Sequence, residues 1–301
     1  MHTQVKDSVM EAIGNTPVVR LKRVFPDAQV VAKLEYMNPG GSIKDRMVRH
    51  MLRGMPAGTR RVVESSSGNT GAALAMASAV YGLDCDVTVP RTTSCEKMKR
   101  IAAYGARVHP CSVEGGVDYH AAAEEIARDS GAYYLDQYCS ELNRQAHYRD
   151  TGPELWGQLA GEIDVFVCGI GSGGTISGIG RYLKEQDPKL RVIGVEPLHS
   201  SYRHLVTDAR TEGEFATVIE GVGKRQPSSS FDPAVVDDVV QVPDEEALEW
   251  VQRLAREEGI LAGGSSGCVS AGIARLLPRL RGARIATVFP DSGAFYLSKY
   301  F

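Results

Sequence analysis

Short apolar runs alternate along this chain with longer stretches that have the periodicity of amphipathic helices. The apolar runs predict ten strands, at residues 30–36, 61–65, 85–90, 107–112, 133–137, 164–170, 191–197, 237–242, 260–264 and 284–291. The helical patterns lie between them, at residues 69–82, 94–105, 119–131, 175–185, 244–259 and 265–280. Regular alternation of strand and helix predicts an α/β fold with mainly parallel sheets flanked by helices. Because ten strands in one open sheet would be unusual, we expect two sheets.

Loops rich in glycine and serine follow several of these predicted strands. They are SSSGNTG (65–71), GIGSGGT (169–175), GGSSG (263–267) and PDSG (290–293), and a fifth segment, NPGGSIKDR (38–46), carries a lysine. In parallel α/β folds, ligands bind beyond the carboxyl ends of the strands. We therefore look for the functional site where these loops meet.

The GIGSGGT loop has the features of a phosphate site. Glycines let the backbone approach an anion closely, and the N-terminus of the following helix offers free N–H groups. Gly169, Gly171 and Gly174 also match a dinucleotide-binding pattern, with Glu196 ending the next strand about where a ribose-binding acid belongs. A tight turn without a ligand is the third interpretation, since an isolated glycine motif is weak.

Two other segments carry side chains that suit an amino-acid ligand. Ser66, Ser67 and Thr70 of SSSGNTG can donate hydrogen bonds to a carboxylate at a helix start, although a polar helix cap would need one of them. Lys44 follows Gly40-Gly41-Ser42 at a strand-to-helix turn. A lysine that is desolvated near a phosphate site is suited to form a Schiff base, because burial lowers its pKa; a solvated surface charge is the alternative. Asp45 and Arg46 are assigned to helix start and packing.

Composition and charge exclude several classes of protein. The 301 residues are 43% hydrophobic, and the formal net charge is −3 with no block of like charges, so we expect neither a nucleic-acid nor a membrane partner. The polar start lacks the order of a signal peptide, and no apolar run is long enough to cross a bilayer. Six scattered cysteines without a C-x-x-C pair indicate reduced thiols, a cytoplasmic protein and no metal site.

Seven motifs together resemble those of the cysteine synthase and cystathionine β-synthase family, which are fold-type II pyridoxal-phosphate enzymes related to the tryptophan synthase β subunit. They occur in family order, as NPGGSIKDR, SSSGNTG, QY with AHYRDTGPELW, GIGSGGT, EGVG, EEGILAGGSSG and PDSG. The resemblance runs from residue 13 to residue 301, nearly the whole chain.

This resemblance implies a cofactor, pyridoxal 5'-phosphate, and a role for each matching residue. Lys44 would hold the cofactor as a Schiff base and move the Cα proton. The other implied cofactor contacts are Asn69 at the ring hydroxyl, Gly171, Ser172, Gly173, Gly174 and Thr175 at the phosphate, and Ser265 at the pyridine nitrogen. The implied substrate contacts are Ser66, Ser67, Thr70, Gln137 and Gly221.

The resemblance also implies a domain organisation. A smaller domain, residues 37–144, would close over the substrate, and residues 1–36 with 145–301 would form a larger cofactor-binding domain. The active site would lie in the cleft between the two sheets. The family further suggests a homodimer.

The implied reaction is a β-replacement on small amino-acid substrates. An activated serine, O-acetylserine or O-phosphoserine, would lose its β-substituent to give an aminoacrylate, and sulfide is the favoured nucleophile, with L-cysteine as product. Serine with homocysteine giving cystathionine, and phosphoserine with an amino acid leading to 2,3-diaminopropionate, remain open. An NAD-dependent oxidoreductase and a non-catalytic relative that binds the cofactor are the alternatives from other classes.

Three departures from the family pattern stand out. The stretch between Arg46 and Glu64 is several residues shorter than usual, and Ser66 stands where threonine is commoner. Lys224 and Arg225 follow EGVG, where sulfhydrylases tend to carry small residues. These cations would attract a phosphate leaving group or an acidic second substrate, unless they belong to a solvated loop face.

Overall fold

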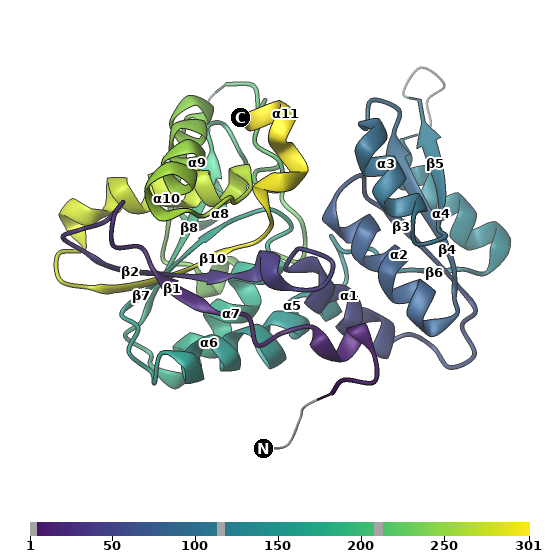
Figure 1. Ribbon diagram of the computed structural model, residues 1–301, viewed down its shortest axis with the longest axis horizontal. Helices are drawn as coiled ribbons and strands as arrows, with labels where there is room; N and C mark the ends of the chain where they lie inside the picture. Colours follow the sequence, from purple (N-terminus) through teal and green to yellow (C-terminus); the bar gives the residue numbers. More distant parts are fainter. Residues whose placement is uncertain (1–4, 113–117, 208–212) are drawn as a thin grey trace.

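The fold contains two separate β-sheets. The structure is a computed structural model that describes residues 5–112, 118–207 and 213–301. Figure 1 shows the sheets in two lobes that lie side by side, with α1 (Lys44–Arg53) and α5 (Glu141–Ala146) between them. The prediction of two helix-flanked, mainly parallel sheets is therefore confirmed.

The larger sheet has six strands in the order β1-β2-β10-β7-β8-β9. Its strands are β1 (Val18–Arg20), β2 (Gln29–Leu34), β7 (Val165–Gly169), β8 (Arg191–Pro197), β9 (Asp238–Val242) and β10 (Arg284–Phe289). All neighbours pair in parallel except β1, which is antiparallel to β2. The carboxyl ends of β7 and β10 consequently lie at the same edge of the sheet and direct the loops GIGSGGT and PDSG toward one side.

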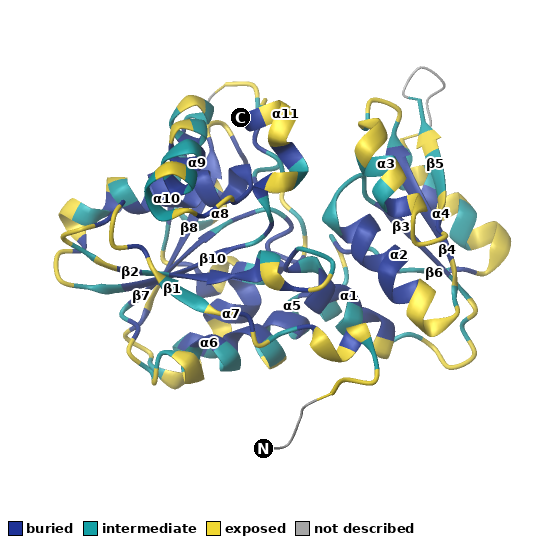
Figure 2. Cartoon of the chain, viewed as in Figure 1, coloured by how far each residue is buried: buried dark blue, intermediate teal, exposed yellow. Residues whose placement is uncertain are grey.

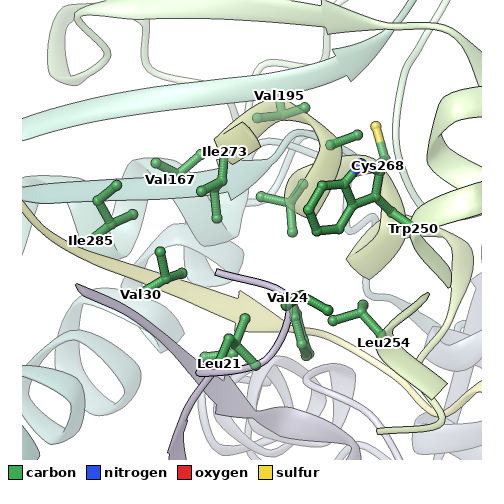
Figure 3. Packing of buried hydrophobic residues seen from close by; sticks show 14 of the residues in the cluster. Leu21, Val24, Val30, Val167, Val195, Trp250, Leu254, Cys268, Ile273 and Ile285 are labelled. Atoms are coloured by element: carbon green, nitrogen blue, oxygen red, sulfur yellow. The ribbon is translucent and has the colours of Figure 1, made fainter. Parts of the chain in front are cut away.

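Helices cover both faces of this sheet. Val165 and Val167 of β7 pack on the side of α9 (Asp244–Glu258) and α10 (Gly264–Leu276), where Trp250 is also buried. Figure 3 shows part of this cluster, with Val167, Val195 and Ile273 around Cys268 and Trp250. Phe166, between the two valines, packs on the opposite face against α6 (Gly152–Gln158) and α7 (Gly174–Gln186). This two-residue alternation buries both faces, as a parallel sheet requires.

The smaller sheet has four parallel strands in the order β5-β4-β3-β6. They are β3 (Arg61–Ser65), β4 (Asp84–Pro90), β5 (Arg107–Cys111) and β6 (Tyr133–Tyr134). The helices α1 (Lys44–Arg53), α2 (Asn69–Tyr81) and α3 (Cys95–Ala102) share a core with one face, and α4 (Tyr119–Ser130) covers the other. α2 is buried along most of its length, whereas α4 has an exposed outer surface (Figure 2).

Short elements complete the chain. They are the 3₁₀ turns Val9–Ala12, Glu35–Met37, Pro233–Val235, Leu277–Arg279 and Gly293–Tyr296, the helices α5 (Glu141–Ala146), α8 (Arg203–Val206) and α11 (Leu297–Tyr300), and a π-helical turn, His147–Thr151. Within the described part of the chain, no helix combines the length and apolar character that a membrane span needs. All six cysteines are free.

One predicted strand is wrong. Residues 260–264 form no strand of either sheet; Ala262 makes a single antiparallel bridge to Ser292, and Gly264 begins α10. The run ILAGG is apolar because Ile260 and Ala262 are buried in the core of the larger sheet, although they join none of its strands. The other nine predicted strands are present, within a few residues of their expected ends. The sequence patterns missed β1 and the helical stretch from α5 to α6.

Candidate active site

A cavity of about 200 Å³ brings together loops from both sheets. Its lining includes ten residues singled out from the sequence: Lys44, Ser66, Ser67, Asn69, Thr70, Gln137, Gly171, Ser172, Gly221 and Lys224. It also includes Tyr138, Glu220 and Tyr296, to which the sequence patterns assigned no role. Loops that are far apart in the chain thus meet at one small polar chamber.

Lys44 is the first residue of α1, and its position is fixed by the loop before it. Gly41 has φ +79°, a conformation that favours glycine, and Ser42 forms a bridge to Asp291. The Ile43 N–H donates to the Pro290 carbonyl (2.8 Å). Burial is the main cause that lowers the pKa of Lys44 to about 8, and the charge of Lys224 is the second. Lys44 therefore offers a much larger fraction of free amine near neutral pH than an exposed lysine does.

The loop GIGSGGT carries unpaired donors at the start of α7. Among the described residues, the backbone N–H groups of Gly171, Ser172 and Gly173 donate to no protein acceptor. The N–H groups in the first turn of α7 have no intrahelical partner either. Gly173 has φ +83°, and a Cβ on Gly171 would lie 2.2 Å from the Gly221 carbonyl oxygen, so this loop requires glycine. Such a row of N–H groups at a helix start suits a phosphate.

Hydroxyl groups from the SSSGNTG loop line the opposite part of the cavity wall. Ser66 and Ser67 lie just before α2, whose N-terminus begins at Asn69. Thr70 is buried and its hydroxyl donates to Gln137 Oε1 (2.8 Å). This bond positions the Gln137 amide, whose NH₂ can then donate to a ligand alongside the serines. The group is an anion site built from neutral donors, which suits a carboxylate.

Asn69 is held by charged neighbours. Its Nδ2 donates to Asp291 Oδ2 (2.7 Å), and its Oδ1 accepts from Arg100 Nη1 (3.1 Å). Asp291 Oδ2 also accepts from the Tyr296 hydroxyl (2.6 Å). Asp291, Arg100 and Tyr296 were missed as site residues, although Asp291 belongs to the PDSG loop that the sequence marked. Asn69 and Tyr296 also line a second cavity of about 420 Å³ toward α3 and α11.

Four residues expected at the cofactor do not line the cavity: Gly173, Gly174, Thr175 and Ser265. Gly174 packs closely on Asn143, since a Cβ there would lie 2.1 Å from Asn143 Oδ1. Thr175 Oγ1 lies 3.3 Å from His147 Nε2. Ser265 is buried in the first turn of α10. Their roles at the cofactor stay predictions.

A buried carboxyl group, Glu64, lies behind the site. It is the last residue but one of β3, is fully buried, and accepts hydrogen bonds from the N–H groups of Ser65 (2.8 Å) and Gln137 (3.3 Å). Desolvation raises the pKa of Glu64 to about 8. Its position inside the apolar run RVVES gave no signal of a role at the site.

Lys224 and Arg225 have different environments. Lys224 lines the cavity, with its Nζ 3.9 Å from the centre of the Tyr138 ring. Arg225 is exposed and its Nη2 donates to Glu214 Oε1 (2.8 Å). The interpretation as a solvated loop face therefore applies to Arg225 but not to Lys224.

The structure argues against the dinucleotide-binding alternative, because Glu196 is not available to bind a ribose. Glu196 is fully buried, and its oxygens accept from the N–H groups of Tyr202 (3.1 Å) and Arg203 (3.0 Å) and from Gln241 Nε2 (3.0 Å). This carboxylate stabilises the turn into α8 and is not exposed to a nucleotide. Among the described residues, no group of three or more His, Cys, Asp or Glu side chains could hold a metal ion.

The donor set fits pyridoxal phosphate. A lysine amine with a lowered pKa can bind an aldehyde covalently, unpaired N–H groups can bind a phosphate, and the hydroxyl loop can bind an amino-acid carboxylate. All three groups border the same cavity.

Comparisons with known proteins show which family the chain belongs to. The family model described as "Pyridoxal-phosphate dependent enzyme" matches residues 9–291. The chain is 37% identical to cysteine synthase B of Pseudomonas aeruginosa, covering 97% of this chain and 96% of that protein. It is 36% identical to a cysteine synthase of Aquifex aeolicus, covering 99% of this chain and 92% of that protein.

Two further relatives carry other names. The chain is 35% identical to a cystathionine beta-synthase of Apis mellifera, covering 99% of this chain but 62% of that longer protein. Among solved structures, the crystal structure of O-ureido-L-serine synthase superposes with a TM-score of 0.89 at 31% identity, covering 98% of this chain and 95% of that chain.

Proposed function

Because the chain belongs to the family of pyridoxal-phosphate-dependent enzymes that includes cysteine synthases and cystathionine β-synthases, we propose that it replaces the β-substituent of an activated serine. The proposed donors are O-acetylserine and O-phosphoserine, and the proposed nucleophile is sulfide, which gives L-cysteine. One observation carries the proposal: the Lys44 amine, the hydroxyl loop and the glycine loop line a single cavity.

Each group has a distinct task in this proposal. When bound, pyridoxal phosphate supplies an electron sink that makes the substrate Cα proton acidic. Lys44 Nζ would hold the cofactor aldehyde and later accept the proton from the substrate Cα. The N–H groups of residues 171–175 would hold the phosphate, with Asn69 and Ser265 at the ring. Burial of Lys44 supports its role, because an amine with a pKa of about 8 can exchange a proton near neutral pH.

The hydroxyl loop would orient the substrate. Ser66, Ser67, Thr70 and Gln137 would bind its carboxylate and so direct the Cα–H bond toward Lys44. Gly221 lies next to Gly171 in the cavity lining, where it would contact the substrate. Loss of the β-substituent and addition of the nucleophile would then occur in a chamber of limited volume, which restricts water.

A product screen tests the proposal. The holoenzyme is mixed with O-acetylserine, O-phosphoserine or serine, each with sulfide, homocysteine or glutamate, and the products are identified by mass spectrometry. We expect cysteine from an activated donor with sulfide. Cystathionine from serine, or a diaminopropionate derivative from glutamate, would assign one of the other β-replacement reactions. Absence of product and of any visible absorption change with every donor would contradict the proposal and favour a non-catalytic relative.

We propose the same organisation for the molecule as the family has. Residues 37–144, which include all strands of the smaller sheet, would move as one domain over residues 1–36 and 145–301. We also propose a cytoplasmic homodimer, in keeping with six free cysteines. Sedimentation at micromolar concentration should give twice the 32.5 kDa chain mass; a monomer mass would contradict the dimer.

A further inference from the structure

Lys44 and Lys224 are the cations of this cavity lining, and neither forms an ion pair with a described carboxylate. Of the charged side chains that line the cavity, Glu220 is paired with Lys97 and with Lys299 (2.9 Å). Lys224, in contrast, makes no ion pair with any described carboxylate and instead lies over the Tyr138 ring. Lys44 is reserved for the cofactor in the proposed function. Lys224 is therefore the cation of this lining that is left to meet a substrate.

The backbone around Lys224 is fixed, so its side chain enters the cavity from a defined point. The Lys224 N–H donates to Ser200 Oγ (3.0 Å). Its carbonyl accepts from the N–H (3.0 Å) and the hydroxyl (2.9 Å) of Ser201. A flexible surface lysine would not be anchored in this way on both sides of its peptide. Tyr138, which carries the ammonium on its ring face, belongs to the same cavity wall as Gln137.

Burial of an unpaired ammonium is unfavourable unless a counter-charge arrives. Desolvation lowers the pKa of Lys224 to about 8, and its charge in turn lowers the pKa of Lys44. An anion bound beside Lys224 would compensate its charge and so reduce the lowering of both pKa values. The carboxylate of the amino-acid substrate already has neutral donors on the SSSGNTG loop. The counter-charge would then come from a second anionic group, farther along the substrate.

We propose that Lys224 binds a negatively charged group carried beyond Cβ by one of the two substrates, and so selects anionic over neutral partners. This inference rests on the proposed function. Two sources share the chemistry: the phosphate of O-phosphoserine as leaving group, and the side-chain carboxylate of an amino-acid nucleophile such as glutamate. The ammonium would donate to the phosphate or carboxylate oxygens, and Tyr138 would limit where the ammonium can lie.

The test uses one neutral variant, one charged variant and a matched neighbour. Lys224→Met keeps length without charge, Lys224→Arg keeps the charge, and Arg225→Met removes the adjacent exposed cation outside the cavity. Each holoenzyme is assayed with O-phosphoserine and O-acetylserine against sulfide, and with O-acetylserine against glutamate. Binding of inorganic phosphate to the same holoenzymes is measured by calorimetry as a readout independent of turnover.

We expect Lys224→Met to lower kcat/KM for the anionic substrate by about 10- to 100-fold, because a hydrogen bond to a charged group is lost. The value for O-acetylserine with sulfide should fall less than the value for the anionic substrate, so that the ratio of the two kcat/KM values drops; Arg225→Met should leave this ratio unchanged. Lys224→Arg should restore most of the anionic preference, and phosphate should bind the wild type and Arg225→Met but not Lys224→Met. Loss with O-phosphoserine alone assigns the leaving group, and loss with glutamate alone assigns the nucleophile.

Two results would overturn the inference in different ways. In the first, an activated donor reacts, but Lys224→Met lowers kcat/KM equally for neutral and anionic substrates or leaves both values unchanged. Lys224 then does not select charge, and the β-replacement proposal stands. If no donor reacts with the wild type, the proposed function is wrong and this inference falls with it.

Discussion

Arg46 provides the most quantitative prediction, because the structure buries it between two carboxylates. It is 1% exposed, its Nε donates to Glu35 Oε2 (2.7 Å), and its Nη1 donates to Glu154 Oε2 (2.8 Å). Lys33 also pairs with Glu154, so the cluster holds two positive and two negative groups. It joins α1, which begins with Lys44, to β2, to the 3₁₀ turn Glu35–Met37 and to α6. Loss of Arg46 would leave Glu35 and Glu154 with Lys33 as the one remaining cation of this cluster.

We expect Arg46→Met to reduce the free energy of unfolding by about 3–5 kcal/mol, the usual cost of removing one partner of a buried ion pair. Arg181→Met is the matched control, since Arg181 is 63% exposed and its Nε lies 3.8 Å from Glu185 Oε1 on α7. That surface pair should contribute about 0.5 kcal/mol or less. Adding Glu35→Gln to Arg46→Met should recover part of the loss, because one of the unpaired charges is removed.

The acid limb of stability gives an independent check on the same cluster. Burial alone would raise the pKa of Glu154, but the hydrogen bonds and charges of Arg46 and Lys33 outweigh it and lower the pKa from 4.5 to about 2. A carboxyl with a lowered pKa contributes stability that is present above pH 4.5 and is lost as the pH falls toward 2. The loss of stability at low pH should be smaller in Arg46→Met, because the pKa of Glu154 is lowered less when Arg46 is absent.

Urea unfolding of the cofactor-free protein, followed by circular dichroism at pH 7 and pH 3, measures these differences. Cofactor binding should weaken as well in Arg46→Met, because Lys44 lies two residues away on the same helix. A loss below about 1 kcal/mol, no greater than that of the Arg181 control, would refute the reasoning that the buried cluster holds α1 in place.

Three further predictions concern the site. Gly171→Ala should reduce pyridoxal-phosphate affinity by at least about tenfold in an absorbance titration, because its Cβ would lie 2.2 Å from the Gly221 carbonyl oxygen. Unchanged affinity would contradict this. Thr70→Val should raise KM for the amino-acid donor about threefold to tenfold with a smaller change in kcat, since the hydrogen bond that positions Gln137 is lost. A fall in kcat alone would count against carboxylate binding. Desolvation raises the pKa of Glu64 from 4.5 to about 8, so the free energy of unfolding should fall as the pH rises across that range. Glu64→Gln should flatten this fall in urea unfolding from pH 5 to pH 9, and an unchanged slope would show that Glu64 is ionised throughout.

Much of the fold was predictable because its strands are buried on both faces. Runs such as DVFVCGI and RVIGVEP are continuously apolar and end in glycine-rich or polar turns, which marks their type and limits. The run at 260–264 was misassigned because its composition is that of a strand, while its place beneath α10 depends on tertiary packing. β1 is only three residues long and half-exposed, so its pattern carries little signal.

Part of the site could also be predicted from local sequence patterns, and part could not. Loops that follow strands could be assigned to one edge, and the cavity lining includes residues from three of the five marked segments. The contacts among Asn69, Asp291 and Arg100 join residues up to 222 positions apart, so no local pattern predicts them. The raised pKa of Glu64 likewise depends on how the chain packs around it and not on the residues beside it.

The most direct test of the account is the identity of the lysine that holds the cofactor, because two lysines with lowered pKa values line the cavity. The holoenzyme is reduced with borohydride, digested with trypsin and sequenced by mass spectrometry. We predict a phosphopyridoxyl group on Lys44, which blocks cleavage there and yields the peptide 34–46. A label on Lys224, or no label while the visible absorption band persists, would contradict the assignment of Lys44 as the cofactor-binding lysine.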